Sequence, residues 1–488
     1  MSSLPTPLSA ADRTALGLAA RKQLARSAHA AIQLQATHSR PRHDPLALLR
    51  ASEAGRIPSL VKIKHERMAA SAFGFFRGAV PIMAADLAAH PNTGLIAQLC
   101  GDAHVENLGA YADATGRLTF DINDFDESLR GPFEYDVKRL ATSLILAGRE
   151  AGIKRPARER AVLHFTAQYR RRMHTFARLP VLELARYQIH RLDETGPIPA
   201  IFAQAERSTP AKTLNSLTEP ISESAKEKMA LKGTAFRPSV KAGKETGVLP
   251  PARIFRSEPP RLTRVTGKQA ALVIASLGPY ARTLQPERRH FLDQYRVQDV
   301  GFKVVGTGSV GLRDYIVYLE GTHACPKNCE PSDPLFLQIK EEPASAYAPY
   351  LPEGSQHTHN GHRVMDGPRA MQLTSDPFLG YTTIDGRDYL VRQLNDHKAA
   401  LDLATLTADS LLAYADLCGE IFARGHARSG DPVAIAAYLG TSARFDEAIH
   451  TFAHQYADQT EAYWAAFKKS LAPTKPSVKK KTATRRHS

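Results

Sequence analysis

The sequence predicts an α+β protein made of a mostly helical large lobe and a small lobe built on an antiparallel sheet. Two observations support this prediction. Apolar residues recur at helical spacing between residues 44 and 205 and again after residue 398, whereas residues 297–395 alternate apolar and polar side chains around a glycine-rich centre. The chain has 488 residues, 43% of them hydrophobic, so it is long enough to bury a large core.

The predicted elements divide the chain into six consecutive segments. The order begins with an N-terminal helical extension, a helical lobe and a polar insertion with little fixed structure. It continues with the sheet lobe, the last helices of the large lobe and a disordered basic tail. Their expected boundaries are 1–43, 44–204, 205–262, 263–397, 398–472 and 473–488.

The composition excludes several classes of protein. Six Lys and Arg residues lie in the tail, which leaves +9 of the formal net charge of +15 for the rest of the chain. Because the tail contains no aromatic residue, we expect no nucleic-acid binding beyond weak contacts of the tail. No apolar run reaches the roughly 18 residues of a membrane span, and four scattered cysteines argue against a disulfide framework. We therefore expect a cytoplasmic protein without membrane contact.

The segment GDAHVENLGAYADATGRLTFDINDFDESLRGPFEYDVKR, residues 101–139, is rich in acidic side chains. NLGAYA and RLTFDI predict two short strands joined by a polar turn, and EYDVKRLATSLILAGREAG predicts a helix. Asp102 and Asn107 lie in the turn before this hairpin, and three further carboxylates, Asp121, Asp124 and Asp126, follow in or after its second strand.

This spacing indicates phosphoryl transfer. Transfer of the γ-phosphate of ATP needs a carboxylate that accepts the proton of the attacking hydroxyl, and an amide with a second carboxylate that hold Mg²⁺. A D-x-x-x-x-N turn followed by a hairpin that ends in D-F supplies these groups in kinases. His104 is expected to hold the turn in shape. A solvated acidic loop or a Ca²⁺ site is the alternative.

GDAHVENLG, NDFDE and GPFEYDVKR resemble the catalytic loop, metal-binding segment and following helix of aminoglycoside-phosphotransferase-like kinases. The resemblance implies that Asp102 is the catalytic base and that Asn107 and Asp124 bind the metal, with Asp121 as an alternative ligand. It also implies that Asp136 braces the catalytic loop.

From about residue 13 to 470 the chain is also similar to a bacterial family known as domain of unknown function 2252. The similarity rests on FFRGAVPIMAADLA, CGDAHVENLGAY, FDINDFDES, GPFEYDVKRLATS, GTGSVGLRDY, FLQIKEE, DPFLGY, VRQLNDHK and ARGHARSGD. This family implies no substrate, so the function has to come from the residues.

A second motif suits a nucleotide. VVGTGSVGLRDY contains G-x-G-x-x-G at Gly306, Gly308 and Gly311, and Lys340 ends an apolar strand, where kinases place the Lys that contacts the phosphates. Asp366, on the next helix, is the expected acidic partner of this Lys. A tight hairpin and a Lys that extends to solvent from a strand edge are the alternatives.

These elements follow the catalytic loop, whereas in ordinary kinases they precede it. We therefore expect a circularly permuted protein-kinase-like fold, with LNDH as the hinge after residue 393. The helix that ends in ARGHARSGD then brings His426, Arg428 and Asp431 to the cleft, with Asp431 as a rival to Asp102 for the role of base. The alternative is an ordinary helix end at Gly430.

The function expected from these motifs is an ATP- and Mg²⁺-dependent phosphotransferase that acts on a hydroxyl of a small molecule. The motifs do not identify this acceptor. A nucleotide-binding pseudoenzyme or regulatory module is the second hypothesis, and a metal-dependent hydrolase that uses Asp102 and His104 is the third.

Overall fold

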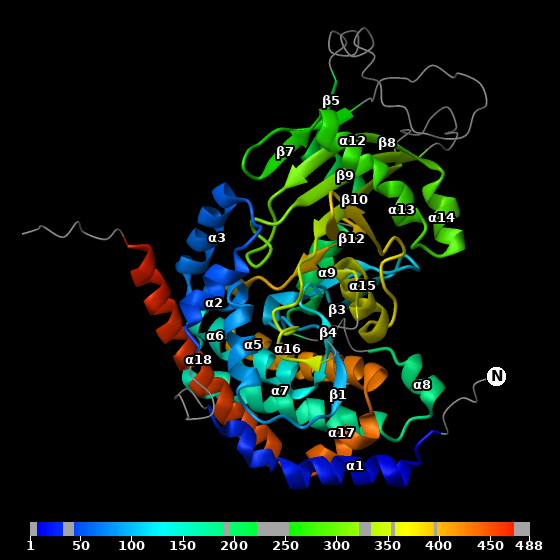
Figure 1. Ribbon diagram of the computed structural model, residues 1–488. Coiled ribbons are helices and arrows are strands. Elements are labelled where there is room, and N and C mark those ends of the chain that lie inside the picture. The colour runs from blue at the N-terminus through cyan, green and yellow to red at the C-terminus, as the bar shows by residue number, and fades with distance from the viewer. Residues whose placement is uncertain are drawn as a thin grey trace, which may run out of the picture.

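The computed structural model describes residues 7–32, 43–189, 196–221, 253–321, 333–352, 357–394 and 398–472. It is a mixed α+β structure with antiparallel sheets, as the sequence predicted. Figure 1 shows a sheet region (the described residues of 253–394) above a helical region formed by the chain before and after it. The basic tail, most of the 205–262 insertion and residues 395–397 of the expected hinge lie outside the described residues.

The sheet region is built on six antiparallel strands in the order β11-β12-β10-β9-β8-β7. Their bounds are β7 (Leu262–Val265), β8 (Tyr295–Lys303), β9 (Asp314–Gly321), β10 (Pro334–Glu341), β11 (Gly380–Ile384) and β12 (Arg387–Gln393). The apolar alternation predicted β8, β9, β10 and β12, but not the shorter β7 and β11.

Alternation along β10 separates two faces of this sheet. Leu337 and Ile339 lie in an apolar cluster with Val273 and Tyr280, which come from the helices over the outer face (Figure 1). These helices are α12 (Gly267–Ala275), α13 (Leu277–Ala281) and α14 (Pro286–Leu292). Because successive side chains of a strand point to opposite faces, Lys340 is directed to the inner face, toward the helical region.

The helical region has its own core. Phe133, Tyr169, Ile421, Tyr438 and Phe445 are buried there together. Its helices are α1 (Ala10–Gln23), α2 (Pro45–Ser52), α3 (Pro58–Ala70), α4 (Ala72–Gly78), α5 (Val80–Ala88), α6 (Glu134–Glu150), α7 (Arg155–Phe176), α8 (Val181–Ala185), α9 (Ile198–Glu206), α16 (Ala408–Ser429), α17 (Pro432–Leu439) and α18 (Arg444–Leu471). Within the described part of the chain, no helix is both long and apolar enough for a membrane span.

The acidic segment forms the predicted hairpin and helix. β2 (Leu108–Ala112) pairs with β3 (Leu118–Ile122), and α6 follows. Two pairings were not predicted: β1 (Ile96–Leu99) with β4 (Leu129–Pro132), and β13 (Ala399–Ala400) with β2. The chain therefore returns from the sheet region directly to the hairpin.

The 205–262 insertion is folded at both ends, contrary to the expectation of little fixed structure. α10 (Pro210–Leu217) leads into β5 (Thr218–Pro220), which pairs with β6 (Arg253–Phe255). Leu214, Leu217 and Phe255 are buried against Phe336 of β10. A few large apolar residues thus anchor a segment whose average composition is polar.

A side chain at Gly101 should strongly lower the free energy of unfolding, because of the backbone conformation and the close packing at this position. Its φ is +81°, and an added Cβ would lie 2.2 Å from the carbonyl oxygen of Glu127. Gly116 has a similar φ of +78° with no heavy atom within 4 Å of such a Cβ. Gly116→Ala should cost about 1–2 kcal/mol for the left-handed backbone alone, and Gly101→Ala about 2 kcal/mol more from overpacking. Urea denaturation of both variants measures the difference, and equal losses would contradict it.

Candidate functional site

The candidate site lies where β10 of the sheet region meets the loop after β3. The Lys340 ammonium contacts Asp126 Oδ2 and lies 3.7 Å from Asp124 Oδ1. The two partners Lys340 and Asp126 are 214 positions apart in the sequence, and Lys340 is 3% exposed. Lys340 of the sheet region therefore faces the acidic segment.

The glycine loop between β8 and β9 reaches the same carboxylate. Ser309 Oγ donates a hydrogen bond to Asp126 Oδ2 at 3.0 Å. Gly306 and Gly311 have φ values of +64° and +96°, which side chains with a Cβ rarely adopt. Arg56 of the helical region donates to the carbonyl oxygens of Gly308 (2.9 Å) and Val310 (2.7 Å).

Several carbonyl groups of this loop accept hydrogen bonds, whereas several of its amides donate none within the described part of the chain. The backbone N–H groups of residues 306–309 donate no hydrogen bond to any other described residue. Amides of this kind in a glycine-rich turn suit the oxygens of an anion such as phosphate.

Asn107 links the two acidic turns and keeps one atom without a partner. Its Nδ2 donates to the carbonyl oxygens of Asp102 (2.9 Å) and Asp124 (3.0 Å). Its Oδ1 is buried and has no hydrogen-bond partner among the described residues. Buried oxygens are normally satisfied, so this amide oxygen, on a side chain that bonds the backbone of Asp124, suits a hard cation such as Mg²⁺.

Asp102 is held by an arginine that the sequence did not indicate. Asp102 Oδ1 accepts hydrogen bonds from Arg139 Nε (2.9 Å) and Nη2 (2.6 Å), and Arg139 is fully buried. Asp102 Oδ2 lies 3.7 Å from His104 Nε2, and the Asp102 side chain is 22% exposed. Burial raises the pKa of Asp102, and the Arg139 charge opposes the shift. Burial lowers the pKa of His104, which is therefore neutral.

Asp136 braces the loop from α6, as the resemblance implied. Its carboxylate accepts hydrogen bonds from the backbone N–H of Cys100 (2.8 Å) and Gly101 (3.0 Å). His426 Nε2 of α16 lies 3.4 Å from the same carboxylate, and Tyr169 lies 2.9 Å from the other ring nitrogen. The loop before Asp102 is therefore fixed by three helices.

Lys340, Asp124 and Asp126 shift one another's pKa values. Burial and the neighbouring Asp124 charge raise the pKa of Asp126. Although burial opposes the shift, Lys340 lowers the pKa of Asp124. Burial likewise opposes the charge of Lys340, but the two carboxylates raise its pKa. Lys340 and Asp124 are thus charged at neutral pH.

Asp121 does not suit the metal role considered for it. It forms a buried ion pair with Arg424 of α16, and the two side chains are 3% and 5% exposed. Asp124, in contrast, is 46% exposed. Of these two carboxylates only Asp124 is open to a ligand, because the side chain of Asp121 points into the core.

The expected pairing of Asp366 with Lys340 is wrong. Asp366 lies on α15 (Asn360–Met371), and its carboxylate is 3.6 Å from His362 and 3.9 Å from His357. The neighbouring Gly367 packs on Ser128 and Phe125, so this turn of α15 presents backbone rather than a carboxylate to the site.

Asp431 is a capping residue rather than a second base. α16 ends at Ser429 with Gly430 as its C-cap, the alternative considered above. Asp431 caps α17 through the amides of Val433 and Ala434 and forms a two-pronged ion pair with Arg13 of α1. Gly430 packs at the start of β1, whereas Asp102 follows the end of that strand.

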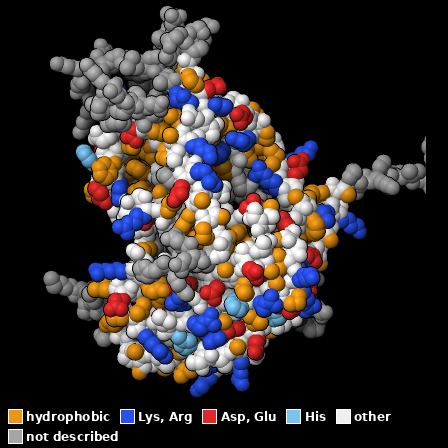
Figure 2. All heavy atoms as spheres, turned by 180° about the vertical axis from the view of Figure 1, so that it is seen from behind, with side chains coloured by type: hydrophobic (Ala, Val, Ile, Leu, Met, Phe, Trp, Pro, Cys, Tyr) orange, Lys and Arg blue, Asp and Glu red, His pale blue; other side chains and the backbone are white. Residues whose placement is uncertain are grey.

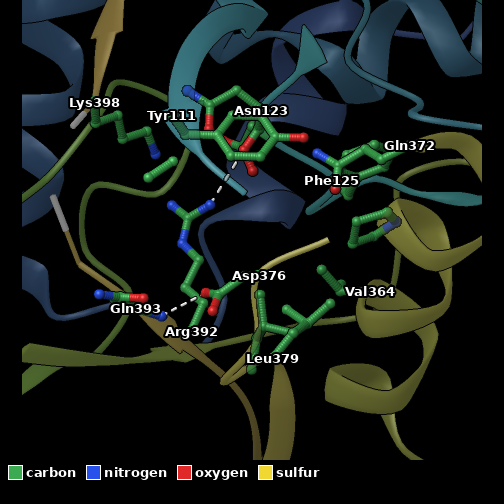
Figure 3. A pocket seen from close by; sticks show the side chains of 14 residues that line it. Tyr111, Asn123, Phe125, Val364, Gln372, Asp376, Leu379, Arg392, Gln393 and Lys398 are labelled. Atoms are coloured by element: carbon green, nitrogen blue, oxygen red, sulfur yellow. Dashed lines mark hydrogen bonds between the residues drawn. The ribbon is translucent and has the colours of Figure 1, made fainter. Parts of the chain in front are cut away.

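Asp124 also lines a small cavity (Figure 3). Its volume is about 80 Å³, and its apolar wall includes Phe125, Val364 and Leu379. Arg392 reaches across it and donates to the carbonyl oxygen of Asn123 at 3.2 Å. Burial and the Arg392 charge lower the pKa of Lys398, at the rim, to about 7.

A family model for an uncharacterized protein conserved in bacteria, DUF2252, matches residues 56–470. The chain belongs to this family. No curated protein and no solved structure matches the chain. The predicted membership in domain of unknown function 2252 is confirmed, and the family description carries no activity.

Sequence reasoning missed Ser309 and Arg139 at this site. Ser309 lies between the glycines of GTGSVG, and a hydroxyl there was a readable signal for a polar contact. Arg139 follows Asp136 by three residues, which places both on one face of α6. The spacing therefore contained the information that both side chains face the loop.

Arg139 should contribute strongly to stability. Arg139→Met leaves the Asp102 carboxylate without its cation and should lower the free energy of unfolding by on the order of 3 kcal/mol. Arg13→Met, which breaks the more exposed pair with Asp431, should cost about 0–1 kcal/mol. Urea denaturation at pH 7 compares the two variants.

The deficit of Arg139→Met should depend on pH. Without the cation, burial raises the pKa of Asp102 further above its unfolded value of about 3.9, and the cost of the charged form grows as the pH rises. The difference from wild type should therefore be smaller at pH 5 than at pH 7. A deficit that is equal at both values would contradict the assignment.

Proposed function

We propose that the protein is an ATP- and Mg²⁺-dependent phosphotransferase that acts on a hydroxyl of a small-molecule acceptor. The observation that carries the proposal is the meeting of the glycine loop and the buried Lys340 with an acidic turn far away in the sequence. The loop amides of residues 306–309 have no hydrogen-bond acceptor among the described residues. Each group suits one need of phosphoryl transfer: a phosphate cradle, a fixed cation and carboxylates.

In this proposal the residues have separate roles. The amides of residues 306–309 and the Lys340 ammonium bind phosphate oxygens. Asn107 Oδ1 and the Asp124 carboxylate would hold Mg²⁺, which supplies positive charge against the phosphate oxygens. Asp102 accepts the proton of the acceptor hydroxyl at Oδ2, since Oδ1 is bonded to Arg139.

The fold that we infer is a circularly permuted, two-lobe protein-kinase-like fold. Along the chain, β8, the glycine loop and β9 precede the Lys strand β10, and α15 follows before β11 and β12. This is the order of the corresponding parts in a kinase small lobe. The catalytic turn before β2 comes earlier in the sequence, and this placement is the permutation.

The pair of Asp102 with Arg139 favours a second candidate, a nucleotide-binding pseudoenzyme or regulatory module. An arginine bonded to a carboxylate makes it a weaker base. The open Oδ2 atom argues for activity instead. Formation of ADP from ATP, with water or added polyols as acceptor, separates the two: a pseudoenzyme binds Mg²⁺ and ATP without forming ADP.

Two substitutions should separate nucleotide binding from chemistry. Asp124→Asn removes a charged ligand of the metal and should weaken Mg²⁺-dependent ATP binding at least about 10-fold. Asp102→Asn should leave ATP binding unchanged and lower the rate of ADP formation by on the order of 10²- to 10⁴-fold. Calorimetry measures binding, and coupled detection of ADP measures the rate.

Asp366→Asn is the matched control. It makes the same chemical change at a carboxylate of similar exposure, 38%, that lies away from Lys340. It should bind ATP as wild type does. The proposal is wrong if wild type shows no Mg²⁺-dependent ATP binding, or if Asp124→Asn and Asp366→Asn behave alike.

A further inference from the structure

Two histidines and a glutamate converge between α7 and α18, outside the site described above. His450 and His454 are one turn apart on one face of α18, and Glu159 comes from α7. One ligand atom of each residue lies within 4.8 Å of the others. His454 Nε2 is 3.8 Å from Glu159 Oε1, and the two histidine rings are 4.9 Å apart.

Two nitrogen atoms of this cluster have no hydrogen-bond partner among the described residues. The Nε2 atoms of His450 and His454 are both buried and accept or donate no hydrogen bond within the described part of the chain. Leaving two buried nitrogens unsatisfied side by side costs free energy, and such atoms in native structures call for an explanation. A cation bonded to both nitrogens would satisfy them.

We propose that Glu159, His450 and His454 form a binding site for a divalent transition metal of the Zn²⁺ type, which joins α7 to α18. Imidazole and carboxylate are ligands of Zn²⁺, and a water molecule completes a four-coordinate site. Bonds of about 2.0–2.1 Å in a tetrahedron place ligand atoms about 3.4 Å apart. The 3.8 Å between His454 and Glu159 is close to this spacing.

The ligands select the kind of ion. Two imidazoles and one carboxylate are a poor set for Mg²⁺ or Ca²⁺, which prefer oxygen ligands. The adjoining pocket is lined by three arginines together with His454, Asp458 and Glu461. Zn²⁺, Ni²⁺ and Cu²⁺ form strong bonds to imidazole. Arg155 Nε donates to Glu159 Oε1 at 2.8 Å, but Arg155 is 72% exposed, and such a pair is weak enough for a metal to displace.

Binding of Zn²⁺ and of Co²⁺ to the full, metal-stripped chain tests the proposal. Wild type should bind one Zn²⁺ at a site that His450→Ala or His454→Ala weakens at least about 100-fold in calorimetry, more than loss of a supporting residue usually costs. Co²⁺ should give the visible absorption of a four-coordinate complex in wild type only. Zn²⁺ should raise the melting temperature of wild type and not of these variants.

Two matched controls make the result decisive. His164→Ala removes an exposed histidine from α7 itself, and His362→Ala removes one from the His357–His362–Asp366 cluster on the sheet region. Both should bind Zn²⁺ at this site as wild type does. The metal-free melting temperature of His454→Ala should match that of wild type, which excludes misfolding. The proposal is overturned if wild type binds no Zn²⁺, or if binding is lost with His362 rather than with His450 and His454.

Discussion

The contact of Lys340 with Asp124 and Asp126 is the constraint on which the rest of the site depends. A buried ammonium is tolerated only beside opposite charge, because its desolvation is costly. The strand that carries Lys340 must therefore dock with its inner face on the acidic turn, and a slip of one residue along β10 would turn Ile339 to the carboxylates instead. The contact thus fixes both the register of β10 in the sheet and the position of the sheet on the helical region.

The acidic turn can receive Lys340 because other buried polar groups hold its backbone. Asp136 fixes the amides before Asp102, and Asn107 bonds the carbonyl groups of both acidic turns. From the sheet region, Arg363 of α15 donates to the carbonyl oxygens of Asp126 (2.9 Å) and Ser128. Because the backbone is held from both regions, the carboxylates can face the ligand side without rearrangement. On the face shown in Figure 2, Lys and Arg side chains are interspersed with Asp, Glu and apolar side chains.

The elements that the sequence predicted correctly are those that depend on patterns among residues close together in the chain. The β2–β3 hairpin, α6 and the strands around the glycine loop follow from apolar periodicity and turn residues. The errors concern pairs that form only in space. Asp121 pairs with Arg424 of the distant α16, and Asp431 pairs with Arg13 of α1. The orientation of α15 directs Asp366 to two histidines. No local spacing distinguishes such carboxylates from those that remain open.

On the proposed function, the same contact couples ligand binding to the arrangement of the two regions. Lys340 and Ser309 now bond Asp126, and Lys340 is 3% exposed. A nucleotide therefore has to move the glycine loop away from Asp126 before its phosphates can reach Lys340. The phosphates of the nucleotide then supply the negative charge that the Lys340 ammonium requires. They therefore offset a loss of the contact between Lys340 and Asp126. Movement of the glycine loop and binding of the nucleotide are then coupled in one equilibrium. A substitution that weakens the hydrogen bond of Ser309 to Asp126 therefore changes the affinity for the nucleotide, although the substituted residue does not contact the nucleotide.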